Sequence, residues 1–337
     1  MTVANPLPSQ SFPTPGAPWR PGLLDDPAGG AGASLGPARR FRATGATPDT
    51  LRRELYAAMQ EGQAADLVAR PHLERLWQQL APLQPGQLDS IRLLLERAGT
   101  RVEQIFLLKA LAANEPWQAL VQYASEMRGR SEADIIRRST MRDDRELIQQ
   151  WQDACGPTVL QAAAGELDPR YAWELNKTWD LSAIDPLGAN QQLASQQRQW
   201  LEIYGGRAVQ RGTAGGAGIA LTRLLNDMLS PLTGVRYTTV PVTDRRQALA
   251  QIAQTLRNGY DVPLRITWDP PGNGAESGHF VLAMAVRAGT SGEELQIHDP
   301  WTGRTVWVAA SAIVGDRLPP MFDRYARLTH HYQPVAG

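Results

Sequence analysis

The sequence predicts an α+β protein, in which an all-α N-terminal region precedes a domain that combines helices with an antiparallel sheet. Between residues 47 and 148 the apolar residues recur at the spacing of amphipathic helices. From Val235 onward, short runs rich in Val, Ile, Thr and aromatic residues alternate with Gly, Pro, Asn and Ser turns. The pattern of residues changes near Gln149, which indicates a boundary between two regions.

Three segments follow from this reading, and 337 residues are enough for two domains. Residues 1–46 are rich in Pro and Gly, and they are predicted to form a flexible tail that buries too little apolar surface to fold. Residues 47–145 are predicted to form a helical bundle domain. Residues 146–337 are predicted to form the mixed domain.

The helical region has a clear start signal in Thr47-Pro48-Asp49, where Thr47 suits the cap and Pro48 the first helical position. We expect a bundle of about five helices, with the Leu, Trp and Phe positions as its core. The expected helices begin at residue 48 and then span 67–80, 88–97, 102–113, 116–127 and, as a short addition, 131–138.

The mixed domain is expected to open with a helix from Cys155 to Gly165, followed by helices at 190–204, 217–229 and 246–258. Strands are expected at 235–242, 262–268, 279–286, 294–299 and 304–308. Glu166-Leu167-Asp168 is interpreted as a solvated turn. His330 and His331 are assigned to a polar tail.

Composition excludes several classes of function. The chain has 34 basic and 34 acidic side chains, so no charge excess points to nucleic acid or to a membrane surface. A single cysteine excludes an intramolecular disulfide and a Cys-rich zinc site. No apolar run approaches the roughly 18 residues of a membrane span, and the N-terminus lacks a conventional signal peptide. A cytoplasmic protein is expected, with export by a route that reads no cleavable signal left open.

The strongest chemical signal surrounds the single cysteine. Cys155 begins a predicted helix, and the N-terminus of a helix stabilises the thiolate that acts as a nucleophile. Pro157 suits the first turn, and Gly156 allows a substrate to approach the backbone. A plain turn into a helix is the alternative interpretation of Cys-Gly-Pro. The case for a catalytic Cys155 therefore depends on partner residues elsewhere in the chain.

Those partners are a histidine and an aspartate at the ends of two neighbouring strands. His279 opens one predicted strand, and Asp299, 20 residues later (299 − 279), ends the next. An antiparallel pairing would bring them together, so that Asp299 orients the His279 base. A strand-end histidine and an Asp-Pro turn are the structural alternatives. Strand alternation directs His298 away from Asp299, so His298 is placed outside the site.

Acyl transfer also needs donors for the oxyanion. The backbone N–H of Cys155 is one candidate. Gln149, six residues before Cys155, is the preferred side-chain donor, with Gln150 and Gln152 as close rivals. Trp151, Trp268 and Trp301 flank these motifs as candidate cleft residues. A Gly-rich stretch at 205–218 is interpreted as an active-site loop in preference to a phosphate site.

The ordered motifs Gln-x5-Cys-Gly-Pro, Gly-His-Phe-Val and Ile-x-Asp-Pro resemble papain-like cysteine peptidases, most closely the bacteriocin-processing (double-glycine) peptidase-like group. The resemblance covers roughly residues 145–315. It implies a papain-like domain in which Gln149, Cys155, His279 and Asp299 are the oxyanion glutamine, nucleophile, base and orienting aspartate. Ala154 departs from the pattern, since many relatives have Asp or Asn there.

These motifs support three functions. The first is a cysteine hydrolase that cleaves a peptide or amide bond through a thioester, with no cofactor and with a peptide or protein as substrate. The second is a glutamine deamidase or transamidase, a bacterial effector or toxin that acts on a partner protein. The third is a catalytically silent papain-like fold that binds proteins, with the N-terminal helical domain as the partner surface.

Overall fold

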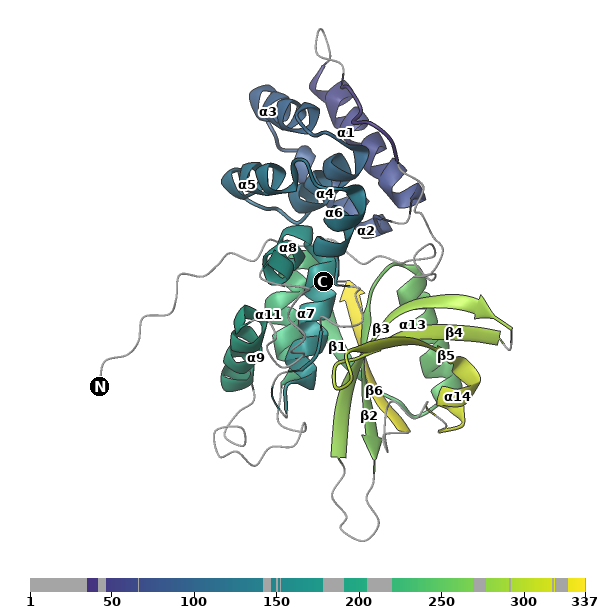
Figure 1. Cartoon of the computed structure of the whole chain (residues 1–337). Helices are drawn as coiled ribbons and strands as arrows, with labels where there is room; N and C mark the ends of the chain where they lie inside the picture. Colours follow the sequence, from purple (N-terminus) through teal and green to yellow (C-terminus); the bar gives the residue numbers. More distant parts are fainter. Residues whose placement is uncertain are drawn as a thin grey trace, which may run out of the picture.

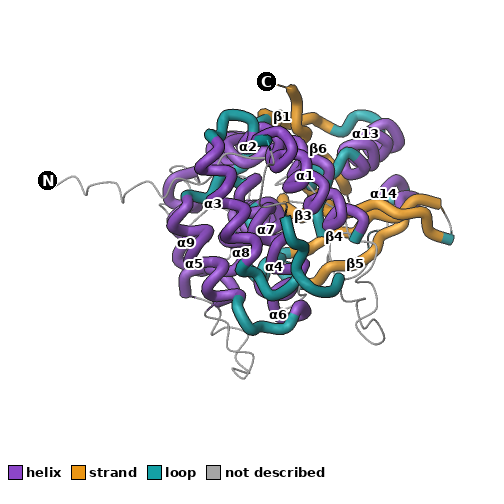
Figure 2. Tube along the Cα trace, turned by 90° about the horizontal axis from the view of Figure 1, so that it is seen from above, coloured by secondary structure: helices purple, strands orange, loops and turns teal. Residues whose placement is uncertain are grey.

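The computed structural model describes residues 35–41, 47–65, 67–141, 147–149, 151, 153–177, 191–204, 220–268, 277–290, 292–316, 318 and 327–336. The protein is α+β with an antiparallel sheet, as the sequence predicts, and the sheet has six strands where five were expected (Figure 1). Viewed from above, α5, α8 and α9 lie on one side of the molecule, and β4, β5 and α14 lie on the other (Figure 2).

The described residues of the region where the sequence predicts about five helices form six. They are α1 (Pro48–Ala64), α2 (Arg70–Leu80), α3 (Pro85–Glu96), α4 (Arg101–Ala112), α5 (Trp117–Met127) and α6 (Glu132–Arg138). The start signal is confirmed, since the Thr47 hydroxyl accepts the Thr50 N–H at 3.2 Å and Pro48 opens α1. Thr100 and Ser131 cap α4 and α6 in the same way.

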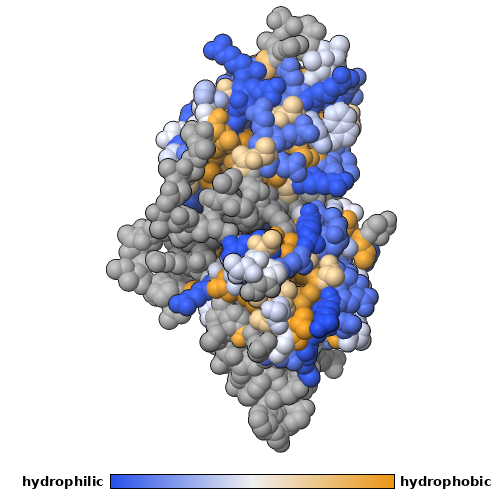
Figure 3. Space-filling model, turned by 90° about the vertical axis from the view of Figure 1, so that its right-hand side faces the viewer, coloured by the Kyte–Doolittle hydropathy of each residue, from blue (hydrophilic) through white to orange (hydrophobic). Residues whose placement is uncertain are grey.

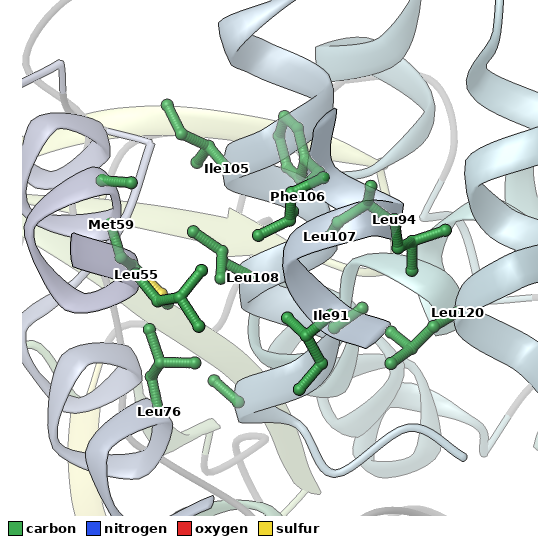
Figure 4. Packing of buried hydrophobic residues seen from close by; sticks show 14 of the residues in the cluster. Leu55, Met59, Leu76, Ile91, Leu94, Ile105, Phe106, Leu107, Leu108 and Leu120 are labelled. Atoms are coloured by element: carbon green, nitrogen blue, oxygen red, sulfur yellow. The ribbon is translucent and has the colours of Figure 1, made fainter. Parts of the chain in front are cut away.

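These helices share one hydrophobic core, which Figure 4 shows from close by. The α4 side chains lie at its centre, because almost every residue of this helix is buried. Leu55, Leu76 and Ile91 reach α4 from three other helices (Figure 4). Because α4 is buried on nearly all sides, it is the central helix of the group, and its buried residues include the polar Glu103, Gln104 and Lys109.

The remaining helices among the described residues belong to the mixed part of the chain. They are α7 (Cys155–Leu167), α8 (Pro169–Lys177), α9 (Gln191–Tyr204), α11 (Leu221–Met228), α12 (Ser230–Thr233), α13 (Arg245–Arg257) and α14 (Ala310–Val314). Three of them, α8, α12 and α14, have no counterpart among the sequence predictions. The others match the predicted spans within a few residues, as expected where capping and periodicity agree.

The sheet follows the order β1-β6-β2-β3-β4-β5 and is antiparallel throughout. Its strands are β1 (Val235–Pro241), β2 (Val262–Trp268), β3 (Ser277–Gly289), β4 (Gly292–Asp299), β5 (Arg304–Ala309) and β6 (Arg327–Ala336). β3 and β4 form a hairpin that closes with Gly289 opposite Gly292. That pairing confirms the predicted antiparallel neighbours and brings the start of β3 near the end of β4.

Helices cover both faces of the sheet. On one face, Phe280, Leu282 and Met284 of β3 belong to a hydrophobic core that they share with residues of α7, α9 and α11. On the other face, Val281 and Ala283 belong to a second hydrophobic core, which includes residues of α13 and α14. Figure 1 shows α7 between the sheet and the helices α9 and α11. The helix that begins at Cys155 therefore lies in the interior of the molecule.

Two predictions about polar segments are wrong. His330 and His331 are not in a tail, because they lie in β6 between β1 and β2, and His331 is fully buried. Glu166-Leu167-Asp168 is not a solvated turn, because all three residues are buried where α7 meets α8. In both cases the burial comes from distant segments, so a local polar pattern could not indicate it.

The surface is mostly polar on the face that Figure 3 shows, with hydrophobic residues in separate groups among hydrophilic ones. Among the described residues, the exposed large hydrophobic side chains include Trp77, Trp117, Trp151 and Trp301. No helix of the described chain is long and apolar enough to cross a bilayer.

Candidate active site

Cys155 is the first residue of α7, as the sequence predicts. The turn before the helix is fixed by hydrogen bonds from Ala154 N to Trp151 O (3.0 Å) and from Thr158 N to Ala154 O (2.9 Å). Every residue of α7 is buried, so the helix is held from all sides. Its N-terminus presents free N–H groups and the positive end of the helix dipole to the Cys155 sulfur.

His279 comes from β3 and Asp299 from the end of β4. The His279 Nε2 lies 2.7 Å from the Asp299 Oδ1, and the two residues are 5% and 1% exposed. The predicted pair is thus brought together in a dry environment, where an ion pair is screened little by water. Because Asp299 occupies Nε2, the ring presents Nδ1 to other groups.

Asp299 is held in place by the turn that follows it. One carboxylate oxygen accepts the Trp301 N–H at 3.0 Å, and the other accepts the Thr302 hydroxyl at 3.0 Å. The Gly303 N–H donates to the Asp299 carbonyl at 2.9 Å, and Gly303 adopts φ = 68°. The Asp-Pro-Trp-Thr-Gly sequence therefore forms both the β-turn and the anchor of the carboxylate.

The surroundings of His279 favour its protonated form. Burial lowers the pKa of His279, but hydrogen bonds to Asp299 and Cys155, with the charges on both groups, raise it to about 9. The Cys155 thiol is therefore a hydrogen-bond partner of the imidazole. With Nε2 bound to Asp299, Nδ1 is the nitrogen left for the sulfur. A positively charged imidazole beside a sulfur is the arrangement that stabilises a thiolate.

Gln149 lies at the same end of the sheet. Its backbone N–H donates to the Pro300 carbonyl at 2.8 Å, which ties it to the residue after Asp299. Its side-chain Nε2 donates to the Trp151 carbonyl at 3.1 Å. The Gln149 amide therefore lies beside the turn that precedes Cys155. The rivals Gln150 and Gln152 lie outside the described residues.

His298 is a residue that the sequence places outside the site, yet it contacts the segment that leads to Gln149. Its Nε2 lies 3.2 Å from the Leu147 carbonyl and its Nδ1 lies 3.1 Å from the Thr305 hydroxyl. Burial lowers the pKa of His298 to about 4, so the ring is neutral at pH 7. Alternation along β4 correctly separates His298 from Asp299, but no local pattern indicates its contact with Leu147.

The aromatic residues named from the sequence occupy different environments. Trp151 is 41% exposed; its indole N–H donates to the Ala194 carbonyl at 2.9 Å, and Arg198 lies over its ring. Trp301 is 59% exposed beside Asp299. Both are therefore available at the surface near the pair. The Trp268 side chain and the Gly-rich stretch at 205–218 lie outside what the structure describes.

No cluster of three or more His, Cys, Asp or Glu side chains suited to a metal occurs among the described residues. Two hollows lie away from His279 and Asp299. One, of about 620 Å³, adjoins the start of α13 and β6, and the other, of about 390 Å³, lies among α2, α3, α4 and α5. The chemistry that Cys155, His279 and Asp299 together support is thiol nucleophilic catalysis.

Comparisons of the chain with protein-family models, with curated proteins and with solved structures found no match.

Proposed function

We propose that the chain is a cysteine-dependent hydrolase of papain-like fold that cleaves a peptide or amide bond. The observation that carries the proposal is the buried His279–Asp299 pair at 2.7 Å, hydrogen-bonded through His279 to a cysteine at the start of a buried helix. The fold assignment rests on the central helix that presents Cys155 and on the antiparallel sheet that presents His279 and Asp299.

In the proposed reaction, the Cys155 thiolate attacks the carbonyl carbon and a sulfur–carbon bond forms. The carbonyl oxygen takes the negative charge, which the Cys155 N–H and the Gln149 side-chain amide stabilise. His279 gives its proton to the leaving amine as the carbon–nitrogen bond breaks. Asp299 holds the ring in position and stabilises its charged form.

Hydrolysis of the thioester completes the cycle. His279, now neutral, accepts a proton from a water molecule whose oxygen attacks the thioester carbon. The sulfur–carbon bond then breaks and releases a carboxylic acid and the thiolate, while His279 keeps the proton. The free enzyme is restored as the thiolate–imidazolium pair, so no cofactor takes part in any step.

The N-terminal helices are proposed to form a bundle that contacts a protein partner or substrate. Their support is the shared core of α1 to α6 and the exposed Trp77 and Trp117 on its surface. Aromatic residues exposed on a polar surface are enriched at protein interfaces.

The test is the rate at which iodoacetamide labels Cys155, followed by intact mass from about pH 4 to pH 9. Because a protonated His279 favours the thiolate, labelling is expected to be rapid near pH 6, below the range of a free thiol with a pKa of about 8.5. His279→Ala should lose this rapid labelling. His330→Ala, which removes a histidine from β6, should keep it.

Slow labelling that rises only near pH 8.5 and is indifferent to His279→Ala would contradict the proposal and favour a silent, protein-binding fold. A reactive Cys155 justifies a substrate screen. Cleavage of backbone amides would support the hydrolase. Release of ammonia from glutamine side chains, with no backbone cleavage, would assign the deamidase function instead.

A further inference from the structure

We propose that His298 is a positioning residue that holds the Gln149 segment in place for oxyanion stabilisation. This inference rests on the proposed function and assigns a role to a residue outside the triad. Its basis is the end of β4, where three consecutive residues, His298, Asp299 and Pro300, each contact a different part of the site.

The first step of the argument is geometric. The residues before the Cys155 turn make two hydrogen bonds to the end of β4, one from His298 Nε2 to Leu147 O at 3.2 Å and one from Gln149 N to Pro300 O at 2.8 Å. Leu147 is fully buried and His298 is 2% exposed, so water cannot easily replace the first bond. Two bonds spaced two residues apart fix both the position and the direction of this short segment.

The second step concerns the tautomer. A carbonyl oxygen only accepts, so His298 must carry its hydrogen on Nε2 to bond Leu147. Nδ1 then accepts the Thr305 hydroxyl hydrogen at 3.1 Å. Thr305 lies directly opposite His298 on β5, so the sheet register supplies a hydroxyl that can donate to Nδ1 in the tautomer that the Leu147 carbonyl requires. The site therefore contains two histidines with separate tasks, one for proton transfer and one for positioning.

The third step connects position with rate. Oxyanion donors must lie at the correct place before the reaction begins, and an error of about 1 Å reduces rates by about 100-fold. The Gln149 side chain already uses one hydrogen on Trp151 O, so its orientation depends on the backbone that His298 holds. The loss of the Leu147 bond should impair steps that form an oxyanion and leave other reactions of Cys155 unchanged.

Two probes separate these reactions without knowledge of the substrate. Iodoacetamide reacts with the thiolate by displacement at a saturated carbon, which forms no oxyanion. p-Nitrophenyl acetate acylates Cys155 through a tetrahedral oxyanion: the sulfur–acyl bond forms as the bond to nitrophenolate breaks, and the nitrophenolate burst is measured. The ratio of acylation to alkylation rates at pH 7 is the readout.

The 337-residue chain is compared with four variants. His298→Leu removes both hydrogen bonds, and His298→Gln keeps a donor near the position of Nε2. Thr305→Val removes the hydroxyl that donates to Nδ1 and so helps to hold the ring against Leu147. His72→Leu is the matched control, because His72 is also a buried histidine whose Nε2 bonds a carbonyl, Leu167 O at 3.3 Å, at the opposite end of α7.

His298→Leu is expected to lower the acylation-to-alkylation ratio by about tenfold or more. His298→Gln should restore the ratio close to wild type, and Thr305→Val should lower it to an intermediate value. His72→Leu should leave the ratio unchanged even where it lowers the melting temperature. If His298→Leu does not fold, the acylation-to-alkylation ratios of Thr305→Val and His298→Gln test the inference.

An unchanged ratio in His298→Leu or Thr305→Val would overturn the inference. So would an equal fall of the ratio in His72→Leu, because that result would assign the effect to general destabilisation. Slow alkylation of the wild type that does not depend on His279 would be a different failure, since it overturns the proposed function itself.

Discussion

At the scale of single residues, the environment of each buried histidine determines its charge. His279 faces a carboxylate and a thiol, and its pKa is raised to about 9 although burial opposes the charge. His298 faces a carbonyl and a hydroxyl, and burial lowers its pKa to about 4. At neutral pH, therefore, His279 is protonated and His298 is neutral, although both lie at the same end of the sheet.

The raised pKa of His279 predicts a pH dependence of stability. Because the folded pKa of about 9 exceeds the unfolded value of about 6.5, the stabilisation is complete below pH 6.5 and is lost as the pH rises to 9. The expected loss is roughly 3 kcal/mol, since each unit of difference between the two pKa values corresponds to about 1.4 kcal/mol. Urea unfolding of the wild type and His279→Gln between pH 6 and 9.5 measures it.

The difference between the two proteins should shrink as the pH rises. Comparing them is necessary because burial raises the pKa of Glu115 to about 8, so Glu115 destabilises the fold over an overlapping range of pH in both proteins. A difference that stays constant from pH 6 to 9.5 would contradict the assignment of a charged His279.

At the scale of elements, α7 is fixed at both ends. Its N-terminus carries Cys155, and its C-terminus is held by the Glu166 carboxylate, which accepts the Met141 N–H at 3.1 Å, and by the His72 contact to Leu167 O. Gly165 directly precedes Glu166 in α7. It permits Met141 to pack directly on the helix, since a Cβ there would come within 1.9 Å of Met141 Cγ.

Gly165→Ala is therefore expected to destabilise the protein by about 1–3 kcal/mol, although alanine is the better helix former. Met141 cannot easily retreat, because its backbone is bonded to Glu166. Gly86→Ala in α3 is the control, since no atom lies within 4 Å of the position of its added Cβ. Thermal melts should show a loss for Gly165→Ala alone; an equal response of both variants would contradict the packing argument.

The elements also show what the sequence could predict. α1 was predictable because its signals are local: Thr47, Pro48 and the apolar spacing all lie within one segment. β6 was not, because its sequence is polar and contains Pro334, and its place depends on β1 and β2, far away in the chain. The strand exists because two distant partners supply its hydrogen bonds, a non-local effect that overrides weak β propensity.

The candidate site likewise has residues that local sequence signals indicate and contacts that they do not indicate. Cys155, His279 and Asp299 could be proposed because each stands at a helix or strand end that local signals reveal, and the hairpin pairing follows from a Gly-rich turn. The bonds from His298 to Leu147 and from Gln149 to Pro300 join residues about 150 positions apart. Nothing in either segment specifies the other, so these contacts emerge from the fold alone.

At the scale of the whole molecule, α8 joins the N-terminal helices to the part that carries the candidate site. Trp173 of α8 is 1% exposed and belongs to the core of α1 to α6. Its indole N–H donates to Glu126 Oε2 at 2.6 Å, and its ring contacts Tyr123 edge-on at 5.4 Å. Asn176, one turn later, donates to the Arg138 and Thr140 carbonyls.

This joint predicts that the described parts unfold together in one transition. Trp173→Ala should cost about 3–5 kcal/mol and lower the temperature at which the whole chain unfolds, including the region around Cys155. Calorimetry combined with iodoacetamide labelling of Cys155 against temperature measures both. Trp117→Ala, which changes an exposed residue of α5, should have an effect within about 0.5 kcal/mol.

Two separate transitions, with Cys155 protected until the second and only the first shifted by Trp173→Ala, would contradict the joint. In that case the N-terminal helices would be an independent module, as the predicted division at residue 145 supposes.

The order of residues at the end of β4 limits how this region can evolve. His298 and Asp299 are adjacent, so they project in opposite directions, and each meets its own partner only in the present alignment of β4 with β3 and β5. A single inserted or deleted residue in the β3–β4 hairpin would exchange the two directions and separate both from their partners. Length changes here should therefore be tolerated only in pairs, whereas many individual substitutions on the outer surface of the hairpin would be accepted.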